Sequence, residues 1–325
     1  MNTEPSFYIR FARDWALALV IFVLGSVLLS GCDFDKASKS FFVGDPLLPV
    51  PSSENRVPDF HQAGGRYSTP TRIQTAPGGT LLVADPERQS ILRAQAETGL
   101  PDQSLFVEGK PLSVAMVADR IVVGVQADQT VNIYDHTGAF QNRLAPIGSI
   151  GIPTDIVIDR ARWIVFVLDG ASSEVKLYSL ARRSWLGTIG TGDLYAPAGI
   201  AIHQNSMQLL VSDYGANAGT AEIRVFSYAP NKFGKRQGSI SGQGRFSTPR
   251  GMTVAQGQVF VTDGLLGQVL VFDLASYELV TLLGRADWGA RDLRTPADVA
   301  VRNNGDVFVA SPGSSSVVVF PGGAP

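Results

Sequence analysis

Short apolar runs recur along most of the chain at a nearly constant interval. Six segments open with a proline followed directly by such a run; these prolines are Pro70, Pro111, Pro153, Pro197, Pro249 and Pro296. A second run ends 14 to 16 residues after each proline, at Asp85, Val125, Asp169, Asp213, Asp263 and Ser311. The runs are short, rich in Val and Ile, and lack the 3.6-residue period of an amphipathic helix. Each therefore predicts a β-strand.

Two further strands complete the repeating unit. A third apolar run, such as Val175 to Tyr178, ends nine residues after the second marker in five units and thirteen residues after it in the fourth. Fourth runs such as Leu279 to Leu283 follow in five units. Four strands in every 41 to 52 residues, separated by Gly, Asp and Asn, are typical of propeller blades. The sequence predicts an all-β fold, a six-bladed β-propeller of four-stranded antiparallel blades.

The sixth unit ends after its third strand, so its outermost strand has to come from elsewhere. Gly64-Gly65-Arg66-Tyr67-Ser68-Thr69-Pro70 parallels the phrase that precedes Pro249 between the fourth and fifth units. By this alignment Arg56 to Ala63 occupy a fourth-strand position. We expect them to pair with Val317 to Phe320 and close the ring, which removes an exposed sheet edge.

The N-terminal segment carries a targeting signal rather than part of the fold. Arg10 and Arg13 precede an apolar run from Trp15 to Gly31, which is short for a membrane-spanning helix. Leu29-Ser30-Gly31-Cys32 resembles the lipobox of bacterial lipoproteins, in which the cysteine thiol receives the lipid. We therefore predict a signal peptide at residues 1–31, a lipid-anchored proline-rich linker at 32–55 and the propeller at 56–325. An incidental cysteine in an uncleaved membrane helix is the alternative.

Cys32 is the only cysteine of the chain, so it has no internal disulfide partner. The lipoprotein resemblance implies an acylated Cys32, attachment to a membrane and a propeller on the periplasmic or outer side of the bacterial cell envelope. Asp33 resembles the signal that retains enterobacterial lipoproteins in the inner membrane, which favours that membrane slightly.

The repeat itself resembles the NHL family. Pro197-Ala198-Gly199-Ile200-Ala201, Val211-Ser212-Asp213 and Val225-Phe226 carry the resemblance most clearly, and the frame recurs over about Arg56 to Pro325. Val125 and Ser311 depart from the expected aspartate. NHL-like propellers include scaffolds, ligand sensors, lactonase-like hydrolases and a metal-dependent amidating lyase, so the resemblance implies the fold and leaves the function open.

Charge and motif content narrow the possible functions. A net charge of −2 does not suit a nucleic-acid surface, which needs concentrated Lys and Arg. The three histidines, His61, His136 and His203, fall at unrelated positions of the repeat, so we do not expect them to share a metal. No Gly-x-Ser-x-Gly elbow is present.

The best candidate site is polar and lies at the mouth of the central channel. Arg72, Asp155 and Asp298 each stand two residues after a repeat proline. The third and sixth blades oppose each other in a six-membered ring, so Asp155 and Asp298 are expected to face each other, with Arg72 beside Asp298. Such a cluster suits a small polar ligand or a divalent cation. Alternatively, the aspartates only cap local turns.

The fourth unit offers a second candidate, a partner-binding loop. Its loop after Asp213 is enlarged and contains Tyr214 and Asn217, and its next turn contains Lys232, Phe233, Lys235 and Arg236. A solvated charged loop is the simpler interpretation. The sequence thus favours a membrane-anchored, non-catalytic scaffold that binds an envelope protein or small ligand, with no cofactor. The alternative is a metal-dependent lactonase-like or lyase-like enzyme that uses the channel mouth.

Overall fold

The computed structural model describes residues 61–63, 67–95, 97–217, 219–241, 245–284 and 293–322. The predicted signal peptide, Cys32 and the predicted linker lie outside these ranges. None of the described residues forms a helix long and apolar enough to cross a membrane. The chain separates into a unit of Met1–Arg56 and a compact unit of Val57–Pro325, and the second unit contains every described strand.

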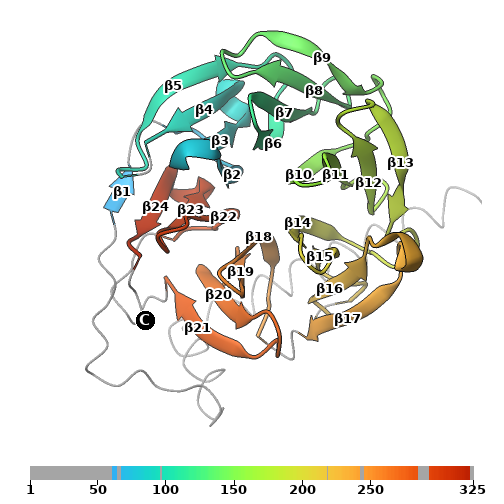
Figure 1. Ribbon diagram of the computed structural model, residues 1–325. Coiled ribbons are helices and arrows are strands. Elements are labelled where there is room, and N and C mark those ends of the chain that lie inside the picture. The colour runs from blue at the N-terminus through green and yellow to red at the C-terminus, as the bar shows by residue number, and fades with distance from the viewer. Residues whose placement is uncertain are drawn as a thin grey trace, which may run out of the picture. The chain divides into compact units, whose positions relative to one another are not determined.

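Six four-stranded antiparallel sheets form a ring (Figure 1). The first blade contains β2 (Arg72–Thr75), β3 (Leu81–Asp85), β4 (Ser90–Ala94) and β5 (Pro101–Phe106). The second contains β6 (Pro111–Val117), β7 (Arg120–Val125), β8 (Thr130–Asp135) and β9 (Phe140–Ala145). The third contains β10 (Pro153–Asp159), β11 (Ile164–Asp169), β12 (Glu174–Ser179) and β13 (Ser184–Ile189).

The other three blades repeat this order from the centre outwards. The fourth contains β14 (Pro197–His203), β15 (Gln208–Asp213), β16 (Glu222–Ser227) and β17 (Arg236–Ser241). The fifth contains β18 (Pro249–Ala255), β19 (Gln258–Asp263), β20 (Gln268–Asp273) and β21 (Leu279–Leu283). The sixth contains β22 (Asp298–Val301), β23 (Val307–Ser311), β24 (Ser316–Phe320) and β1 (His61–Ala63). Short 3-10 turns lie at Pro77–Gly79, Pro86–Arg88, Pro230–Lys232 and Pro312–Ser314.

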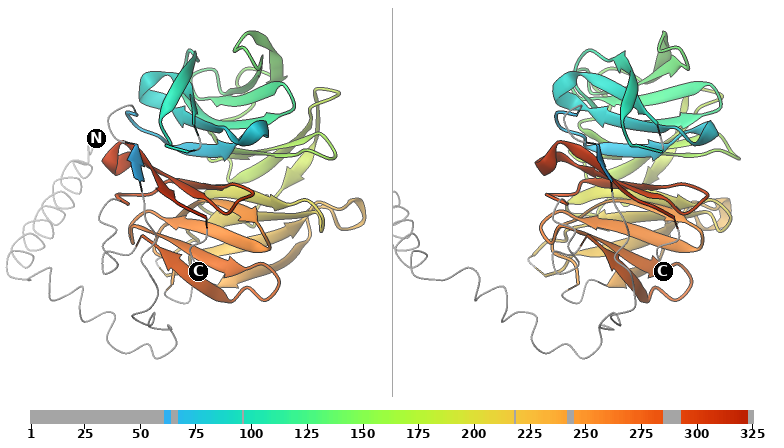
Figure 2. Two further views of the ribbon diagram at one scale, coloured as in Figure 1. Left: turned by 60° about the vertical axis from the view of Figure 1, so that its left-hand side comes forward. Right: turned by 90° about the vertical axis from the view of Figure 1, so that its left-hand side faces the viewer.

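The ring closes as the sequence predicted. β1 pairs antiparallel with β24, and His61, Gln62 and Ala63 lie opposite Val319, Val318 and Val317. Figure 2 shows this short N-terminal strand beside β24. The sixth blade is therefore built from both ends of the propeller, so its edge is paired.

The core lies between blades rather than in the middle of the molecule. Six clusters of buried apolar side chains each join two adjacent blades. Between the third and fourth blades, for example, Phe166 and Leu177 pack with Ile200 and Phe226. Side chains alternate faces along a strand, so one blade serves two clusters. Because the Val57–Pro325 unit contains all six clusters, it holds the complete described core, and we expect it to fold without the N-terminal segment.

The strand directions define two faces of the ring. Inner strands begin, next to the repeat prolines, at what we call the entry face, and they end at the exit face. Antiparallel pairing places the turns between second and third strands at the entry face. The turns between third and fourth strands lie at the exit face for the same reason.

Candidate functional site

Arg72 occupies the centre of the ring. The guanidinium donates hydrogen bonds to backbone carbonyls that each follow a repeat proline, and these belong to the first, third, fourth and sixth blades. The acceptors are Thr71 (3.2 Å), Thr154 (3.1 Å), Ala297 (3.1 Å) and Ala198. β-Bulges between Pro153 and Asp155 and between Pro197 and Gly199 interrupt the strand register where two of these carbonyls lie. One side chain thus joins four of the six blades.

Asp155 supplies the opposite charge. Its Oδ1 lies 3.3 Å from Nε of Arg72, and both side chains are more than nine-tenths buried. Oδ1 also accepts a hydrogen bond from the amide of Ile156 at 2.8 Å, and Oδ2 accepts one from the amide of Ile200 in the next blade at 2.9 Å. Asp155 is therefore more than a cap of its own turn, because it joins the inner strands of neighbouring blades.

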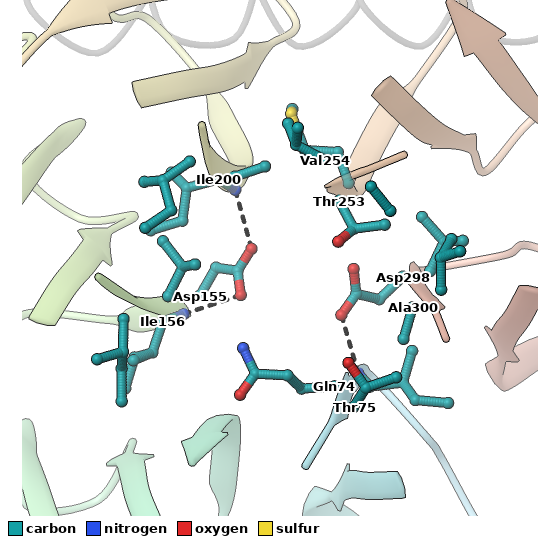
Figure 3. Close-up of a pocket in the computed structure, with 18 of the residues that line it drawn as sticks. Gln74, Thr75, Asp155, Ile156, Ile200, Thr253, Val254, Asp298 and Ala300 are labelled. Carbon is teal, nitrogen blue, oxygen red and sulfur yellow. Dashed lines mark hydrogen bonds between the residues drawn. The ribbon is translucent and has the colours of Figure 1, made fainter. Parts of the chain in front are cut away.

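Asp298 repeats this bond at the opposite side of the ring. Its Oδ2 accepts a hydrogen bond from the amide of Ile73 in the following blade at 2.8 Å. Asp155 and Asp298 both line the channel (Figure 3), as the six-membered ring predicted. Arg72 lies beside Asp298 as predicted, because its guanidinium donates to the carbonyl of Ala297 and the amide of the next residue, Ile73, binds Asp298. Its ion pair among the described residues is nevertheless with Asp155, because the guanidinium crosses the ring from β2 toward the third blade.

The two carboxyl groups differ in charge. Burial raises the pKa of Asp298 to about 8; Arg72 opposes the shift and the negative charge of Asp155 adds to it. Burial also raises the pKa of Asp155, while Arg72 and two amide hydrogen bonds oppose that shift. Because Asp155 contacts the guanidinium directly, it forms the ion pair and Asp298 holds a proton at neutral pH. The cluster is then electrically neutral, which reduces the desolvation cost of burying it.

Small residues make room for these contacts. A Cβ added to Gly251 would lie 2.0 Å from Oδ1 of Asp298 and 2.7 Å from the carbonyl of Ala297. A Cβ on Gly199 would lie 2.4 Å from the carbonyl of Arg250. In the second blade the equivalent residue is Ser113, whose hydroxyl donates to the carbonyl of Pro153 at 2.8 Å. At all three positions a small side chain allows the inner strands of neighbouring blades to approach closely.

A cavity of about 270 Å³ lies in the channel on the exit side of this cluster. Asp155 and Asp298 line it together with the inner strands, and the side chains of Ile156, Ile200 and Ala300 on these strands are buried in the clusters between blades, so the lining is mainly polar. Figure 3 shows one carboxyl oxygen of Asp298 pointing toward the hydroxyl of Thr253. The cavity suits a small polar molecule.

On the entry side, Tyr214 lies near the channel mouth. Burial raises its pKa, and the positive charges of Arg250 and Arg72 oppose that shift, which places all three side chains in one neighbourhood. Nε of Arg250 is buried and has no hydrogen-bond partner among the described residues. Arg250 was not predictable from the repeat, because it directly follows a repeat proline at a position that has no shared residue type across the blades.

The marker aspartates have a shared structural role. Asp85, Asp169 and Asp213 each accept hydrogen bonds from the two consecutive amides that lie just before the repeat proline, at 2.7 to 3.1 Å. Asp263 does the same with Ser247 and Thr248. These four carboxylates fix the position of the loop that leads into their own blade. At Ser311 the hydroxyl instead donates to the carbonyl of Arg294.

The predicted partner loop falls on both faces of the ring. Tyr214 and Asn217 follow a second strand and lie at the entry face, whereas residues 232–236 lie at the exit face. Asn217 is bonded to Thr220 within its own loop. Arg236 forms an ion pair with Glu222 at 2.9 Å, and Phe233 packs against Gly187 of the third blade. These residues therefore do not form one surface.

The channel residues do not fit a metal-ion site. No group of three His, Cys, Asp or Glu side chains suited to a metal occurs among the described residues. His61, His136 and His203 belong to three different blades, the sixth, the second and the fourth. The guanidinium of Arg72 already occupies the position beside Asp155, and amides occupy its oxygens. A hard divalent ion prefers more free oxygen ligands than this cluster offers.

No protein-family model matches the chain, and no curated protein matches its sequence. Solved structures with a similar fold include a gluconolactonase, XC5397 from Xanthomonas campestris, with a TM-score of 0.65, 16% identity and coverage of 82% of this chain and 91% of that one. A chain of Kuenenia stuttgartiensis hydrazine synthase has a TM-score of 0.60 at 12% identity, covering 81% of this chain and 98% of that one. A chain of a nidogen/laminin complex has a TM-score of 0.58 at 17% identity, covering 68% and 82%.

At such low identity these similarities concern the fold alone. They include both an enzyme and a member of a protein–protein complex, so they do not choose between catalysis and binding. The chain is a six-bladed β-propeller whose central channel is crossed by an arginine.

Proposed function

We propose that this protein is a lipid-anchored, non-catalytic binding propeller of the bacterial cell envelope, attached to its membrane through Cys32. The observation that carries the non-catalytic part is the position of Arg72. Its guanidinium fills the centre of the ring with structural hydrogen bonds, and it neutralises the carboxylate that a metal would need. The lipobox resemblance at Leu29 to Cys32 supports the anchor.

Recognition of an envelope protein is proposed for the loops of the entry face. Three large apolar side chains on the third to fifth blades are exposed at this face: Ile152, Tyr195 and Leu265. Exposed apolar side chains gathered on one face are a common feature of protein-binding surfaces. The channel cavity is the alternative place for a small ligand.

The rival function is a metal-dependent lactonase-like or lyase-like activity. The fold similarity to a gluconolactonase and the facing carboxyl groups of Asp155 and Asp298 favour it. Gluconolactone hydrolysis by the purified full chain, with and without added Ca²⁺, Mg²⁺, Mn²⁺ or Zn²⁺, separates the two functions. We expect no metal-dependent turnover above background. Metal-dependent turnover that is lost in an Asp155→Asn variant still folded by circular dichroism would establish the enzyme instead.

Two further measurements test the anchor and the partner. Mass spectrometry of the membrane fraction should find acylated Cys32 as the mature N-terminus, and Cys32→Ser should release the chain from the membrane. A photoreactive residue in place of Tyr195 or Leu265 should give a discrete cross-linked species in cells. Val280, an exposed apolar residue of β21, is the control position. Unmodified Cys32, or cross-linking that is the same at all three positions, would contradict the proposal.

A further inference from the structure

We propose that the exit-face edge of the third and fourth blades is a docking surface for an anionic lipid bilayer. This surface, called the docking edge below, consists of Arg182, Arg183, Trp185, Leu186, Lys232, Phe233 and Lys235. It deepens the proposed membrane attachment, because it would hold the propeller in a fixed orientation against the membrane to which Cys32 tethers it.

The apolar side chains of the docking edge are exposed. Trp185 is 63% exposed, Leu186 is 44% exposed and Phe233 is 40% exposed. Trp185 and Leu186 are consecutive in β13, where side chains normally alternate between the two faces. A β-bulge explains the departure, because Trp185 pairs with Tyr178 and Gly187 pairs with Leu177, which leaves Leu186 without a partner in the register.

Phe233 is held beside these two residues by a dedicated turn. Residues 228–235 join β16 to β17 and form the longest described turn between third and fourth strands. Figure 1 shows its 3-10 turn next to β13 of the third blade. The ring of Phe233 lies over Gly187, where an added Cβ would come within 2.9 Å of the ring. The hydroxyl of Tyr228 donates to the carboxylate of Asp159 in the third blade at 2.9 Å, which fixes the base of the turn.

Basic side chains flank the apolar group on both sides. Arg182 and Arg183 precede Trp185, while Lys232 and Lys235 surround Phe233, and all four are exposed. None of the four has an ion-pair partner within the described ranges. On the entry face, Arg88, Lys110 and Lys176 pair with carboxylates, whereas Arg250 forms no ion pair among the described residues. The docking edge is thus distinguished by four exposed cations that flank a group of exposed apolar side chains.

The chemistry and position of the docking edge favour a bilayer over an acidic protein. Trp is suited to the interface between headgroups and acyl chains, and Lys and Arg stems can lie along apolar surface while their charges reach phosphate groups. β1 runs antiparallel to β24, so its first residue, His61, lies at the exit face. The polypeptide that follows the predicted anchor therefore joins the ring at the face that carries the docking edge.

Vesicle flotation of the Val57–Pro325 unit tests the proposal without any contribution from the anchor. We expect it to bind vesicles of 30% phosphatidylglycerol in phosphatidylcholine, and not vesicles of phosphatidylcholine alone. Each basic side chain near an anionic surface contributes about a fivefold gain in affinity, so Arg182→Gln with Arg183→Gln should weaken binding about 30-fold. Brominated lipids should quench tryptophan emission, and Trp185→Phe should remove most of that quenching.

The matched control is Arg88→Gln with Lys110→Gln, which removes the same charge from the entry face. It should bind vesicles like the unsubstituted unit. Thermal unfolding should be unchanged when Arg182 and Arg183 are replaced, because both side chains are exposed and have no ion-pair partner among the described residues. The control removes the ion pair of Arg88 with the buried Asp85, so its vesicle binding is measured well below its own melting temperature. Absence of binding to phosphatidylglycerol vesicles, or equal weakening by the two double substitutions, would overturn the proposal. Either result would leave the anchor intact, since acylation of Cys32 is measured separately.

Discussion

Arg72→Met removes the central guanidinium and keeps an unbranched apolar stem in its place. In the native ring this guanidinium donates to carbonyls of four blades and forms an ion pair with Asp155 at 3.3 Å. The substitution leaves those carbonyls without this donor and leaves the Asp155 carboxylate buried without a counter-charge. Breaking one side of a buried ion pair costs about 3–5 kcal/mol. For a domain of this size we expect the melting temperature to fall by about 10 °C.

The loss should depend on pH. Burial already raises the pKa of Asp155, and removing Arg72 takes away the main opposing influence. A folded-state pKa above the unfolded value means that the folded protein binds the extra proton, so stability falls as the pH rises. Arg72→Met should therefore be more destabilising at pH 8, where folding must bury a charged carboxylate, than at pH 5.

Urea unfolding of the Val57–Pro325 unit, followed by circular dichroism at both pH values, measures the effect. Arg72→Lys should give an intermediate loss, because it keeps the charge but not the planar fork of donors. Arg93→Met is the control, since Arg93 is partly exposed and makes one side-chain hydrogen bond, to Gln103. A loss below about 1 kcal/mol at pH 8, within the range of ordinary surface substitutions, would refute the structural role of Arg72.

Three other substitutions test neighbouring features. Because the pKa of Asp298 is raised to about 8, stability should fall by up to about 1.4 kcal/mol per pH unit as the pH rises from 4 to 8, and Asp298→Asn should flatten this slope in urea titrations. Gly251→Ala should destabilise the ring by about 2 kcal/mol or more, as overpacking does, whereas Gly238→Ala, with open space around it, should be nearly neutral in thermal unfolding. Burial raises the pKa of Asp169, but hydrogen bonds from Lys176 and two amides outweigh burial and lower this pKa to about 2. Lys176→Met should therefore reduce the free energy of unfolding by about 1.5–3 kcal/mol at pH 7. Because stability from a depressed pKa is lost as the pH falls through that pKa, this cost should shrink below pH 3 in the same urea assay.

The architecture could be predicted from the sequence because residues within each blade mark where its strands begin and end. A proline opens the inner strand, a marker residue ends the second strand, and apolar side chains alternate between them. The structure gives the physical basis of the marker, since Asp85 and its equivalents bind two amides of the loop that enters the blade. Closure by residues before Tyr67 was predictable for the same reason, because the sixth unit lacks an outer strand and the chain offers one at its start.

The sequence also predicted that Arg72, Asp155 and Asp298 lie near one another, because equivalent positions of the repeat lie at the same depth in the channel. What the side chains do at that level was not predictable. Whether a carboxylate binds a cation, caps its own turn or joins two blades depends on atoms contributed by other blades, far away in the chain. Arg72 shows this most clearly, since its acceptors lie up to 225 residues away.

The docking edge depended on tertiary structure in the same way. The sequence alone grouped Lys232, Phe233 and Arg236 with Tyr214, because they belong to one blade. Because the strands are antiparallel, the loop that contains Tyr214 and the turn that contains Phe233 lie at opposite faces. The packing of Phe233 against Gly187 places Phe233 beside Trp185 of the third blade. The repeat pattern determined the ring because it is local and periodic. The surfaces and the channel were decided by contacts between blades, which no local pattern encodes.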